Sequence, residues 1–265
     1  MGLANMSAKE HRAWWRTRRW WLQCLIWLIL LNGLTALVLK SISSEPEVAV
    51  ESRSGMPAPM VETPAVTALI VFLAMSGIAV PIAAISTGQD TFLGERHSGT
   101  AAWVLSKPVS RTAFILGKLI ANGLGFLATG IVIPGVIGYL EITILGRAQL
   151  PWLAFAGAMG LVYLNLLFYL TLAMVLGTLF NGRGPVLGIT LALLIGYQLI
   201  LMFAPWLAEV MPWTFLGSAG QGGSPLAVLL AQGQPLPTVA PIVAAVLWCM
   251  LFVVVAIWRF GREEF

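Results

Sequence analysis

The chain has 265 residues, of which 58% are hydrophobic and only 10% are charged, and its mean hydropathy is +0.88. Soluble domains usually carry about 25% charged residues, so this composition excludes an ordinary soluble domain and indicates an integral membrane protein. The formal net charge of +4 fits contact with anionic membrane lipid, and it predicts no nucleic-acid partner.

Six apolar windows are long enough to cross a membrane as helices. A hydrocarbon core about 30 Å thick takes roughly 20 apolar residues per helix. The windows cover residues 21–39, 66–87, 113–140, 152–180, 185–206 and 240–258. The third and fourth exceed one crossing, so we expect them to tilt or to continue past the membrane surface. The sequence therefore predicts an all-α membrane protein with a single transmembrane domain over residues 1–265.

The cations predict how these spans are oriented. Lys and Arg residues beside a span tend to stay on the cytoplasmic side, and an even number of spans places both termini on one side. If that side is the cytosol, it holds all of the 15 Lys and Arg residues except Lys40, Arg53 and Arg147. We therefore expect a multi-pass protein of the plasma or bacterial inner membrane, with both termini in the cytosol.

Residues 1–20 contain the run HRAWWRTRRWW, in which tryptophans alternate with arginines. Indole rings favour the headgroup region of a membrane, and guanidinium groups favour phosphate. The run predicts an interfacial helix that leads into the first span and anchors it. We do not expect a cleavable signal peptide, because the apolar stretch is long and no convincing small-residue cleavage site follows it.

The predicted spans contain neutral polar residues and no deeply placed ionisable side chain, which an ion-coupled transporter would need. Asn122, Asn165 and Gln198 are either hydrogen-bonding groups between helices or the lining of a substrate path, and the sequence leaves both interpretations open. Cys24 and Cys249 are most simply packing residues.

No metal site or intramembrane catalytic site is expected. His11 and His97 are far apart and have no companion ligands at metal-binding spacing. No serine–histidine pair, HExxH motif or pair of intramembrane aspartates supports an intramembrane enzyme.

Residues 207–239 are semi-apolar but are repeatedly interrupted by glycine and proline. This pattern predicts an extracytoplasmic loop with short re-entrant or surface helices before the sixth span, because irregular backbone at membrane depth must be sheltered by protein or water.

Residues 89–111 form a charged segment between the second and third windows. Its pattern fits either a short amphipathic helix along the inner membrane surface or a solvated loop that only orients the protein. Ser110 is a predicted N-cap of the third span.

Several positions between Asp90 and Lys118 resemble the cytosolic segment after the second helix of type-two, exporter-like ATP-binding-cassette (ABC) permeases. They are Asp90, Gly94-Glu95, Gly99-Thr100, Leu105-Ser106, Pro108-Val109-Ser110-Arg111 and Gly117-Lys118. The resemblance implies a coupling helix that docks against an ATPase subunit. The residues that it assigns to this coupling role are Asp90, Gly94, Glu95, Arg96, Gly99 and Thr100.

The sequence contains no Gly-x-x-x-x-Gly-Lys-Ser/Thr phosphate loop, so we expect ATP and Mg²⁺ to bind a separate ATPase subunit and no cofactor to bind this chain. The resemblance further implies two ATPase copies and a second copy of this chain or a related permease. The expected function is a permease subunit that is not an enzyme by itself and whose substrate is exported.

Two alternatives stay open at the level of sequence. One is a membrane subunit that transmits ATP-driven movement to an extracytoplasmic partner without passing substrate. The other is a membrane scaffold or enzyme unrelated to ABC transporters.

Overall fold

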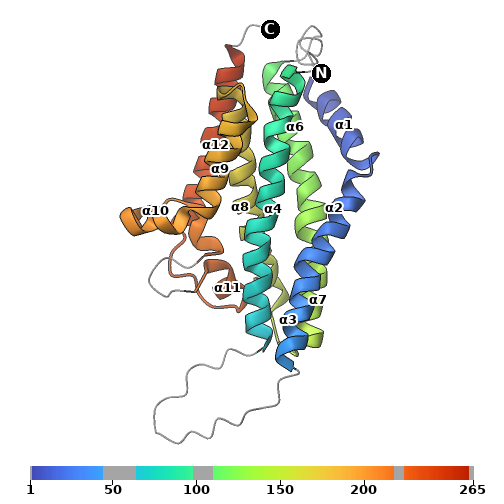
Figure 1. Cartoon of the computed structure of the whole chain (residues 1–265), viewed down its shortest axis with the longest axis vertical. Helices are drawn as coiled ribbons and strands as arrows, with labels where there is room; N and C mark the ends of the chain where they lie inside the picture. The colour runs from blue at the N-terminus through green and yellow to red at the C-terminus, as the bar shows by residue number, and fades with distance from the viewer. Residues whose placement is uncertain (1, 44–63, 98–109, 218–223, 263–265) are drawn as a thin grey trace, which may run out of the picture.

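The computed structural model describes residues 2–43, 64–97, 110–217 and 224–262, and the regular structure in these ranges is entirely helical (Figure 1). The elements in chain order are α1 (Gly2–Trp15), α2 (Arg19–Trp27), η1 (Leu28–Asn32), α3 (Gly33–Ser43), α4 (Pro64–His97), α6 (Arg111–Phe126), η2 (Leu127–Val132), α7 (Ile133–Leu140), η3 (Glu141–Leu145), α8 (Trp152–Leu179), α9 (Arg183–Ile195), α10 (Tyr197–Phe203), η4 (Pro205–Glu209), η5 (Pro212–Phe215), α11 (Leu226–Ala231) and α12 (Ala240–Gly261). The segments η1 to η3 are π-helical, and η4 and η5 are 3₁₀-helical.

Five helical runs in the described residues are long and apolar enough to cross a membrane. They are Trp20–Ile42, Pro64–Asp90, Arg111–Leu145, Trp152–Leu179 and Ala240–Gly261. They stand side by side in an elongated bundle, and both chain ends lie at the same end of it (Figure 1). We call this end the basal end. Five of the six predicted windows therefore correspond to long helical runs, which supports a multi-pass membrane protein.

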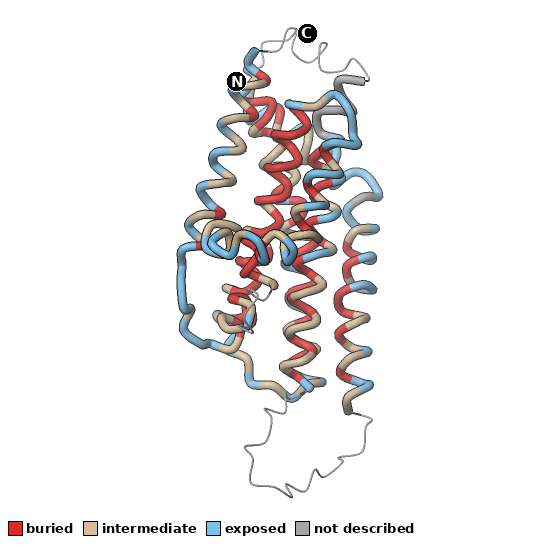
Figure 2. Tube along the Cα trace, turned by 60° about the vertical axis from the view of Figure 1, so that its left-hand side comes forward, coloured by how far each residue is buried: buried red, intermediate tan, exposed pale blue. Residues whose placement is uncertain are grey.

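The fifth predicted window, residues 185–206, is not one straight helix. It consists of α9 and α10, which are bent by 67° at Gly196. A Cβ atom on Gly196 would lie only 2.6 Å from the carbonyl oxygen of Ala192, so glycine fits this bend and a larger residue does not. Beyond the bend, α10 leaves the bundle sideways (Figure 1), and its side chains are mostly exposed or half-buried (Figure 2).

The third span departs from regular α-helix in two places. The π-helical η2 precedes Pro134, and η3 ends the span. Proline removes one backbone donor and crowds the preceding turn, and a widened turn is one way in which a helix accommodates it. Asn32, in the π-helical η1 of the first span, donates its side-chain N–H to the carbonyl of Pro134 at 3.1 Å. The widened segment of the first span is therefore joined to α7, which directly follows η2.

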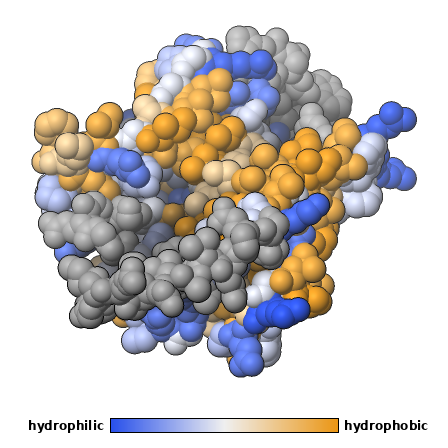
Figure 3. All heavy atoms as spheres, turned by 60° about the horizontal axis from the view of Figure 1, so that its bottom comes forward, coloured by the Kyte–Doolittle hydropathy of each residue, from blue (hydrophilic) through white to orange (hydrophobic). Residues whose placement is uncertain are grey.

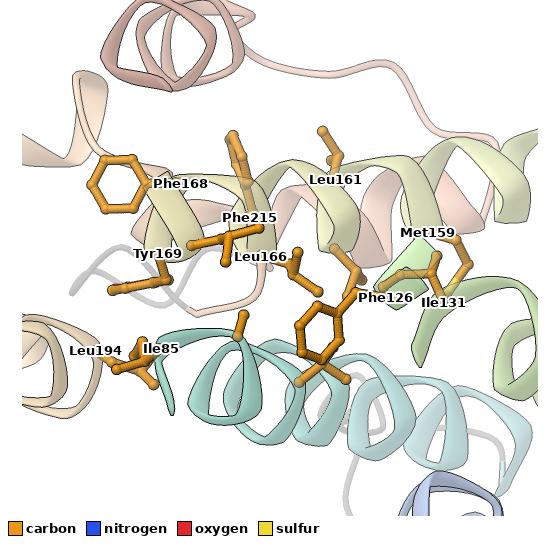
Figure 4. Packing of buried hydrophobic residues seen from close by; sticks show 14 of the residues in the cluster. Ile85, Phe126, Ile131, Met159, Leu161, Leu166, Phe168, Tyr169, Leu194 and Phe215 are labelled. Atoms are coloured by element: carbon orange, nitrogen blue, oxygen red, sulfur yellow. The ribbon is translucent and has the colours of Figure 1, made fainter. Parts of the chain in front are cut away.

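Helix α8 is the centre of the bundle. All residues from 168 to 178 are buried, because α4, α11 and α12 pack around this helix (Figure 2). Tyr169, Phe215, Ile85 of α4 and Leu194 of α9 belong to one buried hydrophobic cluster, which Figure 4 shows from close by. The outer flanks remain apolar, and hydrophobic residues dominate much of the described surface in Figure 3. A surface of this kind suits contact with lipid.

The stretch before the last span folds back into the bundle. A Cβ atom on Gly77, in the middle of α4, would overlap the side chain of Leu216, so the two segments are in close contact. Trp213 of η5 donates its indole N–H to the hydroxyl of Tyr169 at 3.2 Å. Trp248 of α12 likewise donates to the carbonyl of Val210 at 2.9 Å. The short helices in this stretch thus have protein partners for polar groups in the interior.

Candidate coupling site

The basal end brings together elements that are far apart in the sequence. The end of α4, the beginnings of α6 and α9, the end of α12 and the beginning of α1 all lie there (Figure 1). Three polar contacts between these elements define the candidate site.

Helix α4 continues without a break from the second span to His97. The predicted coupling segment therefore begins as the last turns of a membrane helix, and Asp90, Gly94, Glu95 and Arg96 are positions on that one helix. The positions Gly99 and Thr100 lie outside the described residues, as do the side chains of Glu95 and Arg96. The helix has 34 residues and contains Pro81, so its proline-free part from residue 82 to residue 97 connects the basal end to the bundle.

Gly88 fixes how closely α4 lies against α8. A Cβ atom at this position would be 3.0 Å from the Cβ of Ala173 and 3.1 Å from the carbonyl oxygen of Leu170. Both contacts are tighter than ordinary van der Waals packing. The absence of a side chain therefore lets the two helices meet just before α4 reaches Asp90.

The first contact is an ion pair between α4 and α9. Asp90 Oδ1 lies 3.0 Å from Arg183 Nη2, and both side chains are more than half exposed. Sequence reasoning assigned Arg183 only to the membrane orientation and missed this pairing. The only available signal was that Arg183 follows a tight turn at the start of a span.

The second contact joins α6 to the end of α12. Arg111 Nη1 donates to the carbonyl oxygens of Phe260 and Gly261, both at 2.9 Å. These carbonyls belong to the last turn of α12, where a helix lacks internal donors and carries partial negative charge. The rings of Phe114 and Phe260 stack at 5.3 Å beside this contact. The predicted N-cap is confirmed, because the Ser110 hydroxyl accepts the backbone N–H of Ala113 at 3.1 Å.

The third contact holds α1 against α6. The ammonium of Lys118, whose side chain is only 6% exposed, lies 3.5 Å from Glu10 Oε1 and 5.1 Å from the centre of the Phe114 ring. Trp14 is buried and packs edge-on against Phe126 at 5.3 Å. A Cβ atom on Gly125 would overlap the Trp14 indole, so the glycine makes room for that ring. The predicted interfacial helix is therefore packed along the third span.

The three polar residues considered for a substrate path are not brought together. Asn165 is buried and donates to the carbonyl of Gly77 at 3.1 Å, which links α8 to α4. Asn122 is half-buried on α6, and Gln198 is exposed on α10. The observed bond of Asn165 is a hydrogen bond between helices, and the three residues lie on three different helices.

The charged groups of the basal end take part in contacts between helices. In the described ranges, no group of three or more His, Cys, Asp or Glu side chains is placed to hold a metal ion. The last turns of α4 lie at the basal end, and an ion pair joins them to α9. Arg111 binds the last carbonyls of α12 at the same end. Such an arrangement can pass a displacement at the basal end to several spans together.

A bundle of long apolar helices with a helical extension at one end defines a multi-pass membrane protein. The family model described as ABC-2 family transporter protein matches residues 4–265. The chain therefore belongs to the ABC-2 transporter family, as an ABC-type permease. No curated protein matches the chain.

Proposed function

We propose that this chain is the membrane-spanning subunit of an ABC exporter and that it works with a separate ATPase. The family match over nearly the whole chain supports a permease subunit, and this family in general implies an associated ATPase. The proposal includes two ATPase copies, a second copy of this chain and ATP with Mg²⁺ bound only to the ATPase. The chain itself then catalyses no reaction, and both of its termini lie in the cytosol of a cell-membrane protein.

The observation that carries the proposal is the unbroken helix from Pro64 to His97. A partner that closes on ATP binding and presses on the basal end of α4 would move the part of the helix between Pro81 and His97, because no proline interrupts its backbone hydrogen bonds there. The close approach at Gly88 and the Asp90–Arg183 pair would transfer that movement to α8 and α9. The bundle would then shift as a set of rigid bodies relative to its partner copy.

Movement of α9 would also reach the bend at Gly196. The hydroxyl of Tyr169 donates to the carbonyl of Leu193 at 3.4 Å, and it accepts from Trp213. These bonds join the end of α9 to α8 and to the folded-back stretch. Displacement at the basal end could thus change the packing of the interior near η5, which is the response that a permease needs.

Co-purification tests this proposal. The chain would be expressed with a candidate ABC ATPase from the same genome, purified in detergent and reconstituted into lipid nanodiscs. We expect the ATPase to remain bound to the wild type and to be lost with Glu95→Arg, which reverses a charge in the predicted contact. The control is Arg147→Gln, which alters an exposed residue at the opposite end of the bundle.

A second measurement separates export from transmission of movement to an extracytoplasmic partner. Proteoliposomes with the ATPase outside would accumulate substrate in their lumen if the chain exports it. ATPase binding that is unchanged in Glu95→Arg would contradict the coupling role. ATP hydrolysis without accumulation, but with activation of an added extracytoplasmic protein, would contradict the export role.

A further inference from the structure

The helix α1 has two faces of opposite character. Met6, Glu10 and Trp14, spaced by four residues, face α6, where Met6 and Trp14 are buried and Glu10 reaches Lys118. Arg12 and Arg16 are exposed on the other side. Because the first face is fixed to the bundle, the second is held in a defined position and turned away from the protein.

This outward face contains a hollow of about 550 Å³, which is lined by His11, Arg12, Trp15 and Arg16. The indole N–H of Trp15 donates to Nδ1 of His11 at 3.2 Å, and the ring lies 6.0 Å from the ring of Trp20. With Nδ1 as the acceptor, the neutral imidazole carries its proton on Nε2. The polar groups that remain for a ligand are therefore donors: two guanidinium groups and one imidazole N–H.

These donors have no anionic partner among the described side chains. The ion pairs observed there leave out Arg12, Arg16 and Arg18. The acidic residue of the same helix, Glu10, pairs with Lys9 at 3.8 Å and with Lys118 at 3.5 Å. Arginine forks bind phosphate oxygens through paired, charge-assisted hydrogen bonds. A hollow that offers several hydrogen-bond donors and no negatively charged group suits a phosphate anion.

The surface next to the hollow favours a lipid headgroup over a free anion as the ligand. One turn beyond Arg16, exposed indoles and aliphatic side chains begin, and they continue along the outer side of the first span. They are Trp20, Trp21, Leu22, Leu25, Ile26 and Ile29. Exposed tryptophans of membrane proteins concentrate at the level of the lipid headgroups. The hollow thus lies where an apolar, lipid-facing surface meets a cationic one.

We propose that this hollow binds the phosphate of an anionic phospholipid headgroup, with Arg12 and Arg16 as its ligands and the acyl chains along α2. The hollow is a defined site on a helix that is fixed to α6, and it therefore differs from a general attraction between basic residues and the membrane. The proposal does not depend on an ATPase partner.

Native mass spectrometry of the purified full-length chain tests the proposal. Binding of phosphatidylglycerol would be compared with that of phosphatidylcholine carrying the same acyl chains. We expect preferential binding of phosphatidylglycerol, and a loss on the order of tenfold in its affinity for Arg12→Gln combined with Arg16→Gln. Phosphatidylcholine binding should change little.

The matched control combines Arg147→Gln with Arg262→Gln. It removes the same charge from an exposed residue at the opposite end and from a guanidinium that lies 4.2 Å from the Trp258 ring. It should bind both lipids like the wild type. If it loses phosphatidylglycerol as strongly as the test variant does, or if the test variant loses none, the proposed site is wrong.

Two further outcomes would also overturn the proposal. If inorganic phosphate displaces phosphatidylglycerol at comparable concentration, the hollow is a site for free anions. If the test variant keeps its lipid but loses a co-purifying protein, the face serves a protein partner. Circular dichroism of each variant confirms that helix content is retained.

Discussion

Asp90 Oδ1 lies 3.0 Å from Arg183 Nη2, and this ion pair joins α4, near its basal end, to the first residue of α9. The pair is of interest for the helices that it connects, because an exposed ion pair by itself contributes little to stability. The pair is a polar link between the helix that continues into the predicted coupling segment and the helix that leads to the bend at Gly196. The pair thus connects the two helices at the basal end.

The pair should contribute only modestly to stability, because both side chains are more than half exposed. A double-mutant cycle of Asp90→Asn and Arg183→Gln should give a coupling free energy of about 0.2–1 kcal/mol. Thermal unfolding in detergent measures it, and the coupling should fall as the salt concentration rises. Strictly additive effects at low salt would show that the two side chains do not interact in solution.

Glu10 and Lys118 should respond unequally to substitution. Glu10→Gln leaves the buried ammonium of Lys118 without this carboxylate, and we expect a loss of about 1–3 kcal/mol in the free energy of unfolding. Lys118→Met keeps much of the stem's volume and leaves Glu10, which is 20% exposed, able to reach water. It should therefore cost less. Thermal unfolding of both variants makes the comparison, and a larger loss for Lys118→Met would assign the main contribution to the lysine's contact with Phe114.

Gly125→Ala should loosen α1, because the added methyl group would overlap the indole of Trp14. Amide hydrogen exchange should become faster across residues 2–15. Alanine favours helix over glycine by about 1 kcal/mol, so a destabilising result would have to come from this overlap. Gly160→Ala is the control, because a Cβ atom there meets no atom within 4 Å, and it should be neutral or stabilising. Unchanged exchange in Gly125→Ala would show that α1 can shift without loss of packing.

The features that sequence predicted well are local ones. Apolar length alone locates the five long spans, and the Ser110 cap follows from a hydroxyl placed just before a helix. Both depend on residues close together in the chain, so neither requires knowledge of the partners in the fold.

The features that sequence missed depend on distant partners. Residues 185–206 are apolar enough for a straight span, but the structure bends at Gly196. Near this bend, the hydroxyl of Tyr169, in another helix, donates to the carbonyl of Leu193 at the end of α9. The pairing of Asp90 with Arg183 is likewise not predictable from the sequence, because the two residues are 93 positions apart in the chain. Asn165 was one of several neutral polar residues, and only packing shows that Gly77 is its partner.

Tyr169→Phe should loosen the folded-back stretch before the last span. The hydroxyl accepts from Trp213 at 3.2 Å and donates to the carbonyl of Leu193 at 3.4 Å, so its removal leaves two interior polar groups without this partner. We expect a cost of about 1–3 kcal/mol and faster amide exchange in residues 193–217. Hydrogen exchange with mass spectrometry resolves this region.

The same change at Tyr139 provides the control for Tyr169→Phe. The Tyr139 hydroxyl donates to the carbonyl of Leu150 at 3.1 Å, near the turn between the third and fourth spans. Tyr139→Phe should therefore raise exchange near residues 148–152 and leave residues 193–217 unchanged. If both variants loosen the same residues, the effect is a general loss of bundle stability. If Tyr169→Phe leaves exchange in 193–217 at the wild-type level, the Tyr169 hydroxyl does not hold the bend, which the absence of a Cβ atom at Gly196 permits without it.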